Sequence, residues 1–247
     1  MVTISVVLIV KNEEANLYET LESVSWADEI IIVDSGSEDA TTSIARKFTR
    51  HVYLHDWPGF GAQKNRALDY ASMDWVLSLD ADERVTPELR IEILQAIREH
   101  QADGFFIPRK SQFCGNFVRH CGWYPDYVLR LFKREKGRFS DSLVHESLIL
   151  HGTTAKLSFP LLHYSYRNKI DVTRKIEQYS LAAAQQMLEK GKKAVLLDAP
   201  LRAFWAFFRT YFLRLGILDG RTGWDIARMN AITTYRKYKL LRNFRAH

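Results

Sequence analysis

Residues 4–14 read Ile4-Ser-Val-Val-Leu-Ile-Val-Lys-Asn-Glu-Glu14, an apolar run that turns polar after Val10. A short run of mostly β-branched residues is typical of a strand buried on both faces. From Glu14 to Ser25 the apolar residues recur at helical spacing. The stretch therefore predicts a strand, a polar turn and a helix, which is the first unit of a parallel α/β sheet.

The same unit repeats further along the chain. Strands are predicted at residues 30–33, 52–54 and 75–79. The helices between them are predicted around Ile44 and Phe48, with Ser37 or Asp39 as cap, and over residues 61–71. Thr86-Pro87 then starts another helix, because threonine caps and proline fits the first helical position. The alternation predicts an α/β fold, a Rossmann-like and mostly parallel sheet flanked by helices, with the loops after the strands along one edge.

Beyond about residue 103 the pattern changes. Short segments rich in aromatic residues and glycine run to about residue 166, and we expect an irregular second half of the same domain there. Helical patterns return at residues 172–190, 201–218 and 224–241. The organisation predicted is one domain over residues 1–170 and a helical region over 171–247.

Composition excludes several classes of protein. The 247 residues are 47% hydrophobic and 13% aromatic, without repeats or low-complexity tracts, so the chain is expected to be folded throughout. Cys114 and Cys121 match neither a zinc nor a redox spacing, which favours ordinary thiols in a reducing cytoplasm. We expect no signal peptide, because no basic segment or cleavage site flanks the first apolar run. No charge-free window reaches the roughly 20 apolar residues of a membrane span.

The positive charge is concentrated at the end of the chain. The net charge is +6, and residues 200–247 contain ten Lys or Arg against Asp219 and Asp225. A helical projection of residues 202–218 separates the arginines from one broad aromatic face: Phe204, Trp205, Phe208, Tyr211, Phe212 and Leu215. Arg202, Arg209 and Arg214 lie elsewhere on that projection. The pattern favours a helix that lies on an anionic membrane surface, and the alternative is a helix packed on the rest of the protein.

Polar turns follow three of the predicted strands. They occupy residues 11–14, 34–39 and 80–82, and ligands of open parallel sheets bind beyond such strand ends. Asp80-Ala-Asp82 places alternate carboxylates at the end of a buried strand, where at least one requires a metal, a cation or water. A divalent ion completed by substrate phosphates is the usual solution, and the alternative is a solvated turn that caps the next helix.

These motifs, in this order, resemble those of family 2 glycosyltransferases, which have the GT-A fold. The resemblance rests on Ile4–Glu14, Val33-Asp-Ser-Gly-Ser-Glu-Asp39, Gly61-Ala-Gln-Lys-Asn-Arg66 and Leu79-Asp-Ala-Asp-Glu83. Within that family, the chain resembles in detail the branch that adds β-1,4-linked glucose to the lipopolysaccharide inner core. The resemblance to this branch continues past the nucleotide half, through Arg130-Leu-Phe-Lys-Arg134, Val144-His-Glu146, Leu162-His163 and the basic tail.

The resemblance implies a role for each polar turn. Asp34 would accept from the uracil ring, Glu13 would lie beside the ribose, and Lys64 near the base and phosphates. Asp80 would face the donor sugar or ribose, and Asp82 would be the main ligand of Mg²⁺ or Mn²⁺. His163 resembles a late histidine that reaches the metal or the diphosphate, although a lone histidine is more often structural.

The acceptor side follows from the same resemblance. Many relatives have Glu-Asp where this chain has His145-Glu146, and Glu146 is the favoured catalytic base, with Asp126 or Asp141 as alternatives. Glu146 would deprotonate the acceptor hydroxyl and invert the anomeric carbon. His145, Asp126 and the aromatic Trp123, Tyr124 and Tyr127 would contact the acceptor sugar, although each aromatic is as readily a core residue.

The implied function is an inverting transfer of a hexose, glucose from UDP-glucose, to a heptose of the lipopolysaccharide inner core. The nucleotide-sugar half would span about residues 1–102 and the acceptor half about 103–170. The basic region 171–247 would bind the inner face of the bacterial inner membrane from the cytoplasm. Other glycan, lipid or polypeptide acceptors remain alternatives.

Two other classes of protein fit less well. A nucleic-acid-binding module could use the basic, aromatic tail, but the acidic strand ends would repel phosphates unless they held a metal. A nucleotidyltransferase usually needs a glycine-rich loop after its first strand, and residues 11–14 contain no glycine. We therefore expect no nucleic-acid partner.

Overall fold

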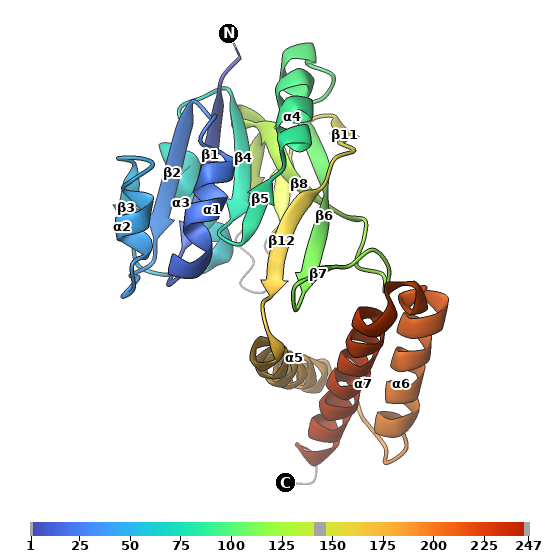
Figure 1. Cartoon of the computed structure of the whole chain (residues 1–247). Helices are drawn as coiled ribbons and strands as arrows, with labels where there is room; N and C mark the ends of the chain where they lie inside the picture. The colour runs from blue at the N-terminus through green and yellow to red at the C-terminus, as the bar shows by residue number, and fades with distance from the viewer. Residues whose placement is uncertain (1, 141–146, 245–247) are drawn as a thin grey trace. The chain divides into compact units, whose positions relative to one another are not determined.

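The computed structural model describes residues 2–140 and 147–244 (Figure 1). The chain forms two compact units. Unit 1 comprises Met1–Arg109 and Asp126–His163, and unit 2 comprises Lys110–Pro125 and Tyr164–His247. Residues 110–125, expected in the acceptor half of the first domain, therefore belong to the same compact unit as the C-terminal helices.

The nucleotide half of unit 1 has the predicted α/β order. Four parallel strands lie in the order β3-β2-β1-β4, and the intervening helices are α1 to α3. The bounds are β1 Ile4–Val10, α1 Glu14–Ser23, β2 Glu29–Asp34, α2 Thr41–Ala45, β3 Val52–Leu54, α3 Phe60–Tyr70 and β4 Trp75–Asp80. The predicted Rossmann-like sheet is confirmed.

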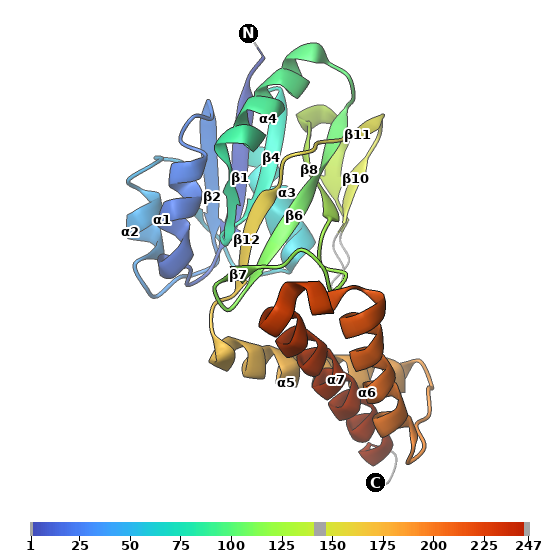
Figure 2. The ribbon, with the colours of Figure 1, turned by 45° about the vertical axis from the view of Figure 1, so that its right-hand side comes forward.

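Alternate strand residues bury against opposite faces of this sheet. On β1, Val6 and Leu8 join the larger core cluster, whereas Val7 joins the smaller one. The larger cluster includes residues of α1 and of α4 (Pro87–Glu99), and the smaller one includes residues of α3. Figures 1 and 2 show α1 and α4 covering one face, with α3 behind the strands. Both faces are covered, which explains why the strands read as continuous apolar runs.

The two predicted helix caps have different outcomes. Thr86 caps α4 as expected, because its side chain accepts a hydrogen bond from the Leu89 amide. At α2 the N-cap residue is Ala40, and Asp39 accepts from the Thr41 amide at 2.9 Å. Ser37 instead donates to Asp34, so the alternative prediction of Ser37 as the cap of α2 is wrong.

The segment expected to be irregular contains two long strands. β6 spans Gly104–Phe113 and β8 spans Asp126–Lys133, and they pair antiparallel to each other. The sheet continues in the order β4-β8-β6-β12-β5, and β7 and β11 also pair with β6. The remaining bounds are β5 Glu83–Val85, β7 Asn116–Phe117, β9 Gly137–Phe139, β10 Leu148–Leu150, β11 Thr154–Lys156 and β12 Leu161–Tyr166. Charged residues that enter the ion pairs described below interrupt the apolar pattern of β6 and β8, which hid these strands.

Unit 2 is mainly helical. Its long helices are α5 (Lys169–Glu189), α6 (Asp198–Phe208) and α7 (Gly220–Asn243), and α6 and α5 both contact α7. The expected helix over residues 201–218 is wrong beyond Leu213. The α-helix passes into a π-helical turn over Arg209–Leu213, and Leu215 is left-handed with φ 55°. None of the helices in the described parts of the chain is long and apolar enough to cross a membrane.

Candidate active site

The parallel strands bring the predicted polar turns to one edge of the sheet. Val10 at the end of β1 pairs with Asp34, and the preceding Ile9 pairs with Asp80 at the end of β4. Parallel strands share a direction, so the loops that leave their carboxyl ends emerge together. The structure thus places the turns after β1, β2 and β4 side by side.

Asp34 organises the turn after β2. Its side chain is 1% exposed and accepts hydrogen bonds from the amides of Gly36 and Ser37, at 3.2 and 2.9 Å, and from the Ser37 hydroxyl. Gly36 has φ 82°, a left-handed conformation that glycine adopts readily. The carboxylate therefore holds the loop in a fixed shape at the sheet edge.

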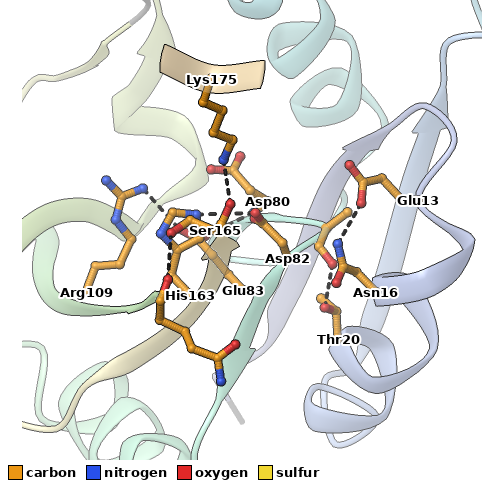
Figure 3. Close-up of polar contacts among 12 residues, drawn as sticks. Glu13, Asn16, Thr20, Asp80, Asp82, Glu83, Arg109, His163, Ser165 and Lys175 are labelled. Carbon is orange, nitrogen blue, oxygen red and sulfur yellow. Dashed lines mark hydrogen bonds and ion pairs between the residues drawn. The ribbon is translucent and has the colours of Figure 1, made fainter. Parts of the chain in front are cut away.

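The turn after β1 is bonded to its neighbour. The Glu13 amide donates to Thr41 Oγ1 at 2.7 Å, and the Asn12 amide donates to Ser37 Oγ at 2.9 Å. The Glu13 carboxylate accepts from Asn16 Nδ2 at 2.8 Å, a contact drawn in Figure 3. The first two loops thus form one hydrogen-bonded rim.

Asp80 lies between two cations. Its carboxylate pairs with Lys64 Nζ at 3.3 Å and with the Arg130 guanidinium. Burial alone would raise the pKa of the Asp80 carboxyl, but the positive charges of Arg130 and Lys64 outweigh burial and hold this pKa well below its usual range. Asp80 is therefore ionised at neutral pH, although its side chain remains 34% exposed.

A buried network behind Asp80 fixes its position. Glu83 is fully buried, and its Oε1 accepts from Arg130 Nη2 at 2.7 Å and from Arg109 Nη1 at 3.4 Å. Its Oε2 accepts from the Asp80 amide at 3.1 Å. Arg109 also donates to Asp126 Oδ2 from Nε and Nη2, at 3.0 and 2.7 Å. The network thus sets three carboxylates against the three cations Lys64, Arg109 and Arg130, which balances the charge around the buried Glu83.

The sequence motifs include Glu83 and Arg130 without predicting a role for either, and they do not include Arg109. A signal for one of them was present, because Arg130 interrupts the apolar run of β8 beside Leu131 and Phe132. A charged residue within a buried strand requires a partner of opposite sign. The identity of that partner depends on the pairing of β8 with β4, which the local pattern does not specify.

Asp82 and His163 approach each other at the same edge. Asp82 Oδ2 lies 3.3 Å from His163 Nε2, and the two side chains are 27% and 16% exposed. Antiparallel pairing of β12 with β5 places His163 opposite Glu83, and Thr20 Oγ1 donates to the Ala81 carbonyl at 2.7 Å, which anchors the turn (Figure 3). This contact places His163 beside Asp82, and its predicted role at the metal or the diphosphate stays a prediction.

The Asp82–His163 pair has the chemistry of a divalent-metal site. A carboxylate oxygen and an imidazole nitrogen are both metal ligands, and these two are close enough to bind one ion. No group of three or more His, Cys, Asp or Glu that could hold a metal occurs among residues 2–140 and 147–244. Asp82 and His163 by themselves fit an ion that takes its remaining ligands from substrate oxygens and water.

The predicted acceptor residues are distributed over the two units. Trp123 and Tyr124 belong to unit 2, and Asp126 and Tyr127 belong to unit 1. Trp123 packs against Phe113 and Tyr166, with ring centroids 5.9 and 5.5 Å apart, so this aromatic contributes to a small core cluster. Glu146 and His145, the favoured base and its neighbour, lie outside the described residues.

The fold and the polar edge together define a GT-A glycosyltransferase. The crystal structure of residues 1–349 of TarS from Staphylococcus aureus aligns with 99% of this chain and 91% of that chain, with a TM-score of 0.51 and 17% identity. This likeness shows the fold. The chain belongs to glycosyl transferase family 2, whose model matches residues 5–155.

Relatives in sequence extend over the whole chain. The lipopolysaccharide core biosynthesis glycosyltransferase LpsC of Rhizobium meliloti is 30% identical, over 96% of this chain and 93% of LpsC. An uncharacterised glycosyltransferase of Rickettsia felis is 27% identical, over 98% of this chain and 90% of that protein. The similarity therefore includes unit 2 as well as the nucleotide half.

Proposed function

We propose that the protein transfers a hexose from a UDP-sugar, with UDP-glucose as the expected donor, to a lipopolysaccharide core acceptor with inversion at the anomeric carbon. The observation that carries this proposal is the gathering of Asp34, Lys64, Asp80 and Asp82 with Glu13 at one edge of a GT-A sheet. The similarity to LpsC over nearly the whole chain supports a glycolipid core as acceptor.

The donor would lie along the rim formed by the first two loops. Asp34 and Glu13 would contact the uracil and the ribose, while Lys64 and Asp80 would lie nearer the diphosphate and sugar. TarS, which shares the fold at a TM-score of 0.50 in that complex, was solved with UDP-GlcNAc. Lys64 is 5% exposed and paired with Asp80, so it would face the donor from a fixed position.

Asp82 and His163 would hold Mg²⁺ or Mn²⁺. Such an ion neutralises charge that develops on the leaving diphosphate. Arg130 would keep the neighbouring Asp80 ionised and fixed, because its guanidinium bridges Asp80 and Glu83. These residues would thereby prepare a site for the leaving group before the donor arrives.

Glu146 would act as the general base toward the acceptor hydroxyl. Of the two alternatives, Asp141 lies outside the described residues, and one oxygen of Asp126 already accepts two hydrogen bonds from Arg109. A carboxylate that positions an arginine is less suited to remove a proton. This contact favours Glu146, as the resemblance implies.

Unit 2 would place the enzyme on an anionic membrane. Its exposed apolar residues concentrate before and along α6 and its π-helical turn: Val195, Leu196, Leu197, Leu201, Phe204, Trp205, Phe212 and Leu213. Arg209 and Arg214 are also exposed there. Exposed aromatic residues beside arginines suit the interface of a bilayer, where a lipid-linked acceptor would be found.

Product analysis tests the proposed reaction. The purified protein would be incubated with Mn²⁺, truncated lipopolysaccharide cores and a panel of UDP-sugars, and the products measured by mass spectrometry and by NMR of the anomeric proton. A gain of one hexose from UDP-glucose, with a β linkage, is the expected result. Transfer from a different donor, or only to a non-lipopolysaccharide acceptor, would contradict the proposal.

A further inference from the structure

A cavity of about 490 Å³ lies within unit 2. Its walls are the first halves of α5 and α7 and the turn that joins β6 to β7. This volume falls in the range of small-molecule sites. None of the residues assigned to the donor or the acceptor lines it.

The crossing of α5 and α7 gives the cavity its shape. The two helices meet at Ser180, whose hydroxyl donates to the Thr233 carbonyl at 3.3 Å, and at the Glu177–Arg236 ion pair. Figures 1 and 2 show α5 running across α7, so the helices diverge toward their first turns. The cavity occupies the space between those diverging segments, from Ile176 and Ile232 near the crossing to Lys169 and Arg221 at the helix starts.

Three cations line this cavity. Lys169, Arg221 and Arg228 make no hydrogen bond or ion pair through their side chains with any residue that the structure describes. Asp225 is the one acidic residue of the lining, so the wall carries two net positive charges. The three cationic side chains are exposed, and they differ from other exposed cations of unit 2, such as Lys192 and Lys193, in that they gather around one cavity. Unpaired cations gathered around a cavity favour an anionic ligand.

The remaining lining is apolar. Ile176 and Met229 are each 8% exposed and belong to a core cluster, and Val172, Ile232 and Phe113 complete the apolar part of the wall. An inorganic anion would leave this surface in contact with water. A ligand with an anionic group and a hydrocarbon chain would satisfy both parts of the wall.

We propose that this cavity binds a phosphate-bearing amphiphile. Its phosphate would lie among Lys169, Arg221 and Arg228, and its hydrocarbon chain would cover Ile176, Met229 and Ile232. The site is separate from the donor residues, and the proposal does not depend on the transfer reaction. An anionic lipid bound here would add a specific contact to the general attraction between unit 2 and a membrane.

Cys114 provides a direct readout of occupancy. It lines the cavity and is partly exposed, whereas Cys121 is fully buried. Burial raises the pKa of both thiols, that of Cys121 to about 12, so alkylation at pH 8.5 should be slow and confined to Cys114. The full-length protein would be treated with iodoacetamide, and modification of the Cys114 peptide followed by mass spectrometry.

Three probes, each used below its micelle-forming concentration, separate the contribution of the phosphate from that of the hydrocarbon chain. Dodecyl phosphate should slow alkylation of Cys114 roughly tenfold at saturation, because the chain covers the thiol. Inorganic phosphate and the neutral dodecyl maltoside should protect far less. If inorganic phosphate protected Cys114 equally well, the cavity would be a site for simple anions. If dodecyl maltoside protected it equally well, the cavity would be a site for apolar chains alone. Either result would overturn the proposal.

Matched variants locate the binding. The triple change Lys169→Gln, Arg221→Gln and Arg228→Gln should weaken dodecyl phosphate binding at least roughly tenfold by calorimetry. The control Lys190→Gln, Lys192→Gln and Lys193→Gln removes the same charge from exposed positions outside the cavity and should bind like the wild type. The single change Arg228→Gln offers a milder variant that should weaken binding in the same direction. Unchanged binding in both cavity variants, or equal loss in the control, would overturn the assignment.

Discussion

At the scale of single residues, the donor edge depends on charges that hold one another in place. Asp80 pairs with Lys64 and Arg130, and Arg130 also pairs with the fully buried Glu83. Asp80 and Arg130 are 50 positions apart in the sequence. A buried network of this kind is costly to interrupt, because each group that loses its partner remains away from water.

Arg130→Met should therefore destabilise the protein. The change leaves the buried Glu83 carboxylate with the Arg109 guanidinium, at 3.4 Å, and the Asp80 amide, at 3.1 Å. We expect a loss of about 3–5 kcal/mol in the free energy of unfolding measured in urea. Arg174→Met is the matched control, because its ion pair with Asp171 is exposed and worth at most about 1 kcal/mol. Equal losses in the two variants would show that the network contributes no more than a surface pair.

Asp82→Asn tests the metal site. The amide retains the size of the side chain but is a weaker ligand, so we expect turnover to fall by roughly 100-fold or more while the unfolding midpoint changes little. Asp74→Asn serves as the control, because the Asp74 carboxylate accepts hydrogen bonds from the amide and the hydroxyl of Thr3, at 3.3 and 3.1 Å, away from the metal site. Full turnover of Asp82→Asn, or of the wild type in excess EDTA, would reject Asp82 as a metal ligand.

Glu146→Gln tests the general base. Glutamine preserves the shape but cannot accept the proton, so transfer should be abolished while calorimetry shows unchanged UDP binding. Near-normal turnover would exclude Glu146. Loss of turnover in Asp126→Asn or Asp141→Asn in that case would identify the base instead.

At the scale of elements, α7 begins in a close contact. A Cβ added at Gly223 would lie 1.7 Å from the carbonyl oxygen of Gly216, in the short 3-10 turn that precedes the helix. The same region is fixed by Asp219, which accepts hydrogen bonds from the His120 amide at 2.8 Å and pairs with the His120 ring. The start of α7 and the loop after β7 are thus held together at close range.

Gly223→Ala should destabilise unit 2 although alanine favours helices. Within an unobstructed helix, replacing glycine by alanine stabilises by about 0.5–1 kcal/mol. Here the backbone carbonyl of Gly216 blocks the added methyl group, so the sign should reverse in thermal unfolding. Thr234→Ala, on the same helix, should change stability by less than about 0.5 kcal/mol. A more stable Gly223→Ala protein would show that the turn can move aside.

At the scale of the whole molecule, the exposed apolar and basic residues of unit 2 form the surface through which the protein would bind a membrane. Phe207 and Tyr211 pack against Trp224 of α7, at 4.9 and 5.5 Å, whereas Phe204, Trp205 and Phe212 are exposed. The predicted aromatic face is therefore divided between helix packing and solvent. Arg202, which the sequence pattern assigned to membrane binding, already forms an ion pair with Asp198 at 3.1 Å.

Liposome co-sedimentation tests this surface. Phe204→Ser, Trp205→Ser and Phe212→Ser together should release the protein from anionic liposomes, as should Arg209→Glu with Arg214→Glu, and binding should weaken as salt rises. The control Leu54→Ser, Ile91→Ser and Phe159→Ser removes exposed apolar residues from unit 1 and should not affect binding. Binding indifferent to salt and to both unit 2 variants would reject the proposed membrane surface.

The sequence alone determined the α/β half of unit 1 and the family. Strand and helix periodicities are local, so residues 4–10, 52–54 and 75–79 could be assigned to strands, and the parallel order then brought residues 11–14, 34–39 and 80–82 to one edge. Asp34 and Asp80 are the last residues of β2 and β4, and Asp82 lies two residues beyond β4. The roles implied for them stay predictions.

Only the tertiary structure decided which distant groups meet. Arg130 with Glu83, residues 110–125 with the C-terminal helices, and the cavity between α5 and α7 all arise from segments far apart in the sequence. The helix expected over residues 201–218 ended early because Arg209–Leu213 forms a π-helical turn, in which the buried Thr210 accepts from Asn230 of α7 at 3.1 Å. The periodicity of apolar residues indicates which face of a segment is buried. Which other segment packs on that face depends on packing and on charge pairing across the fold.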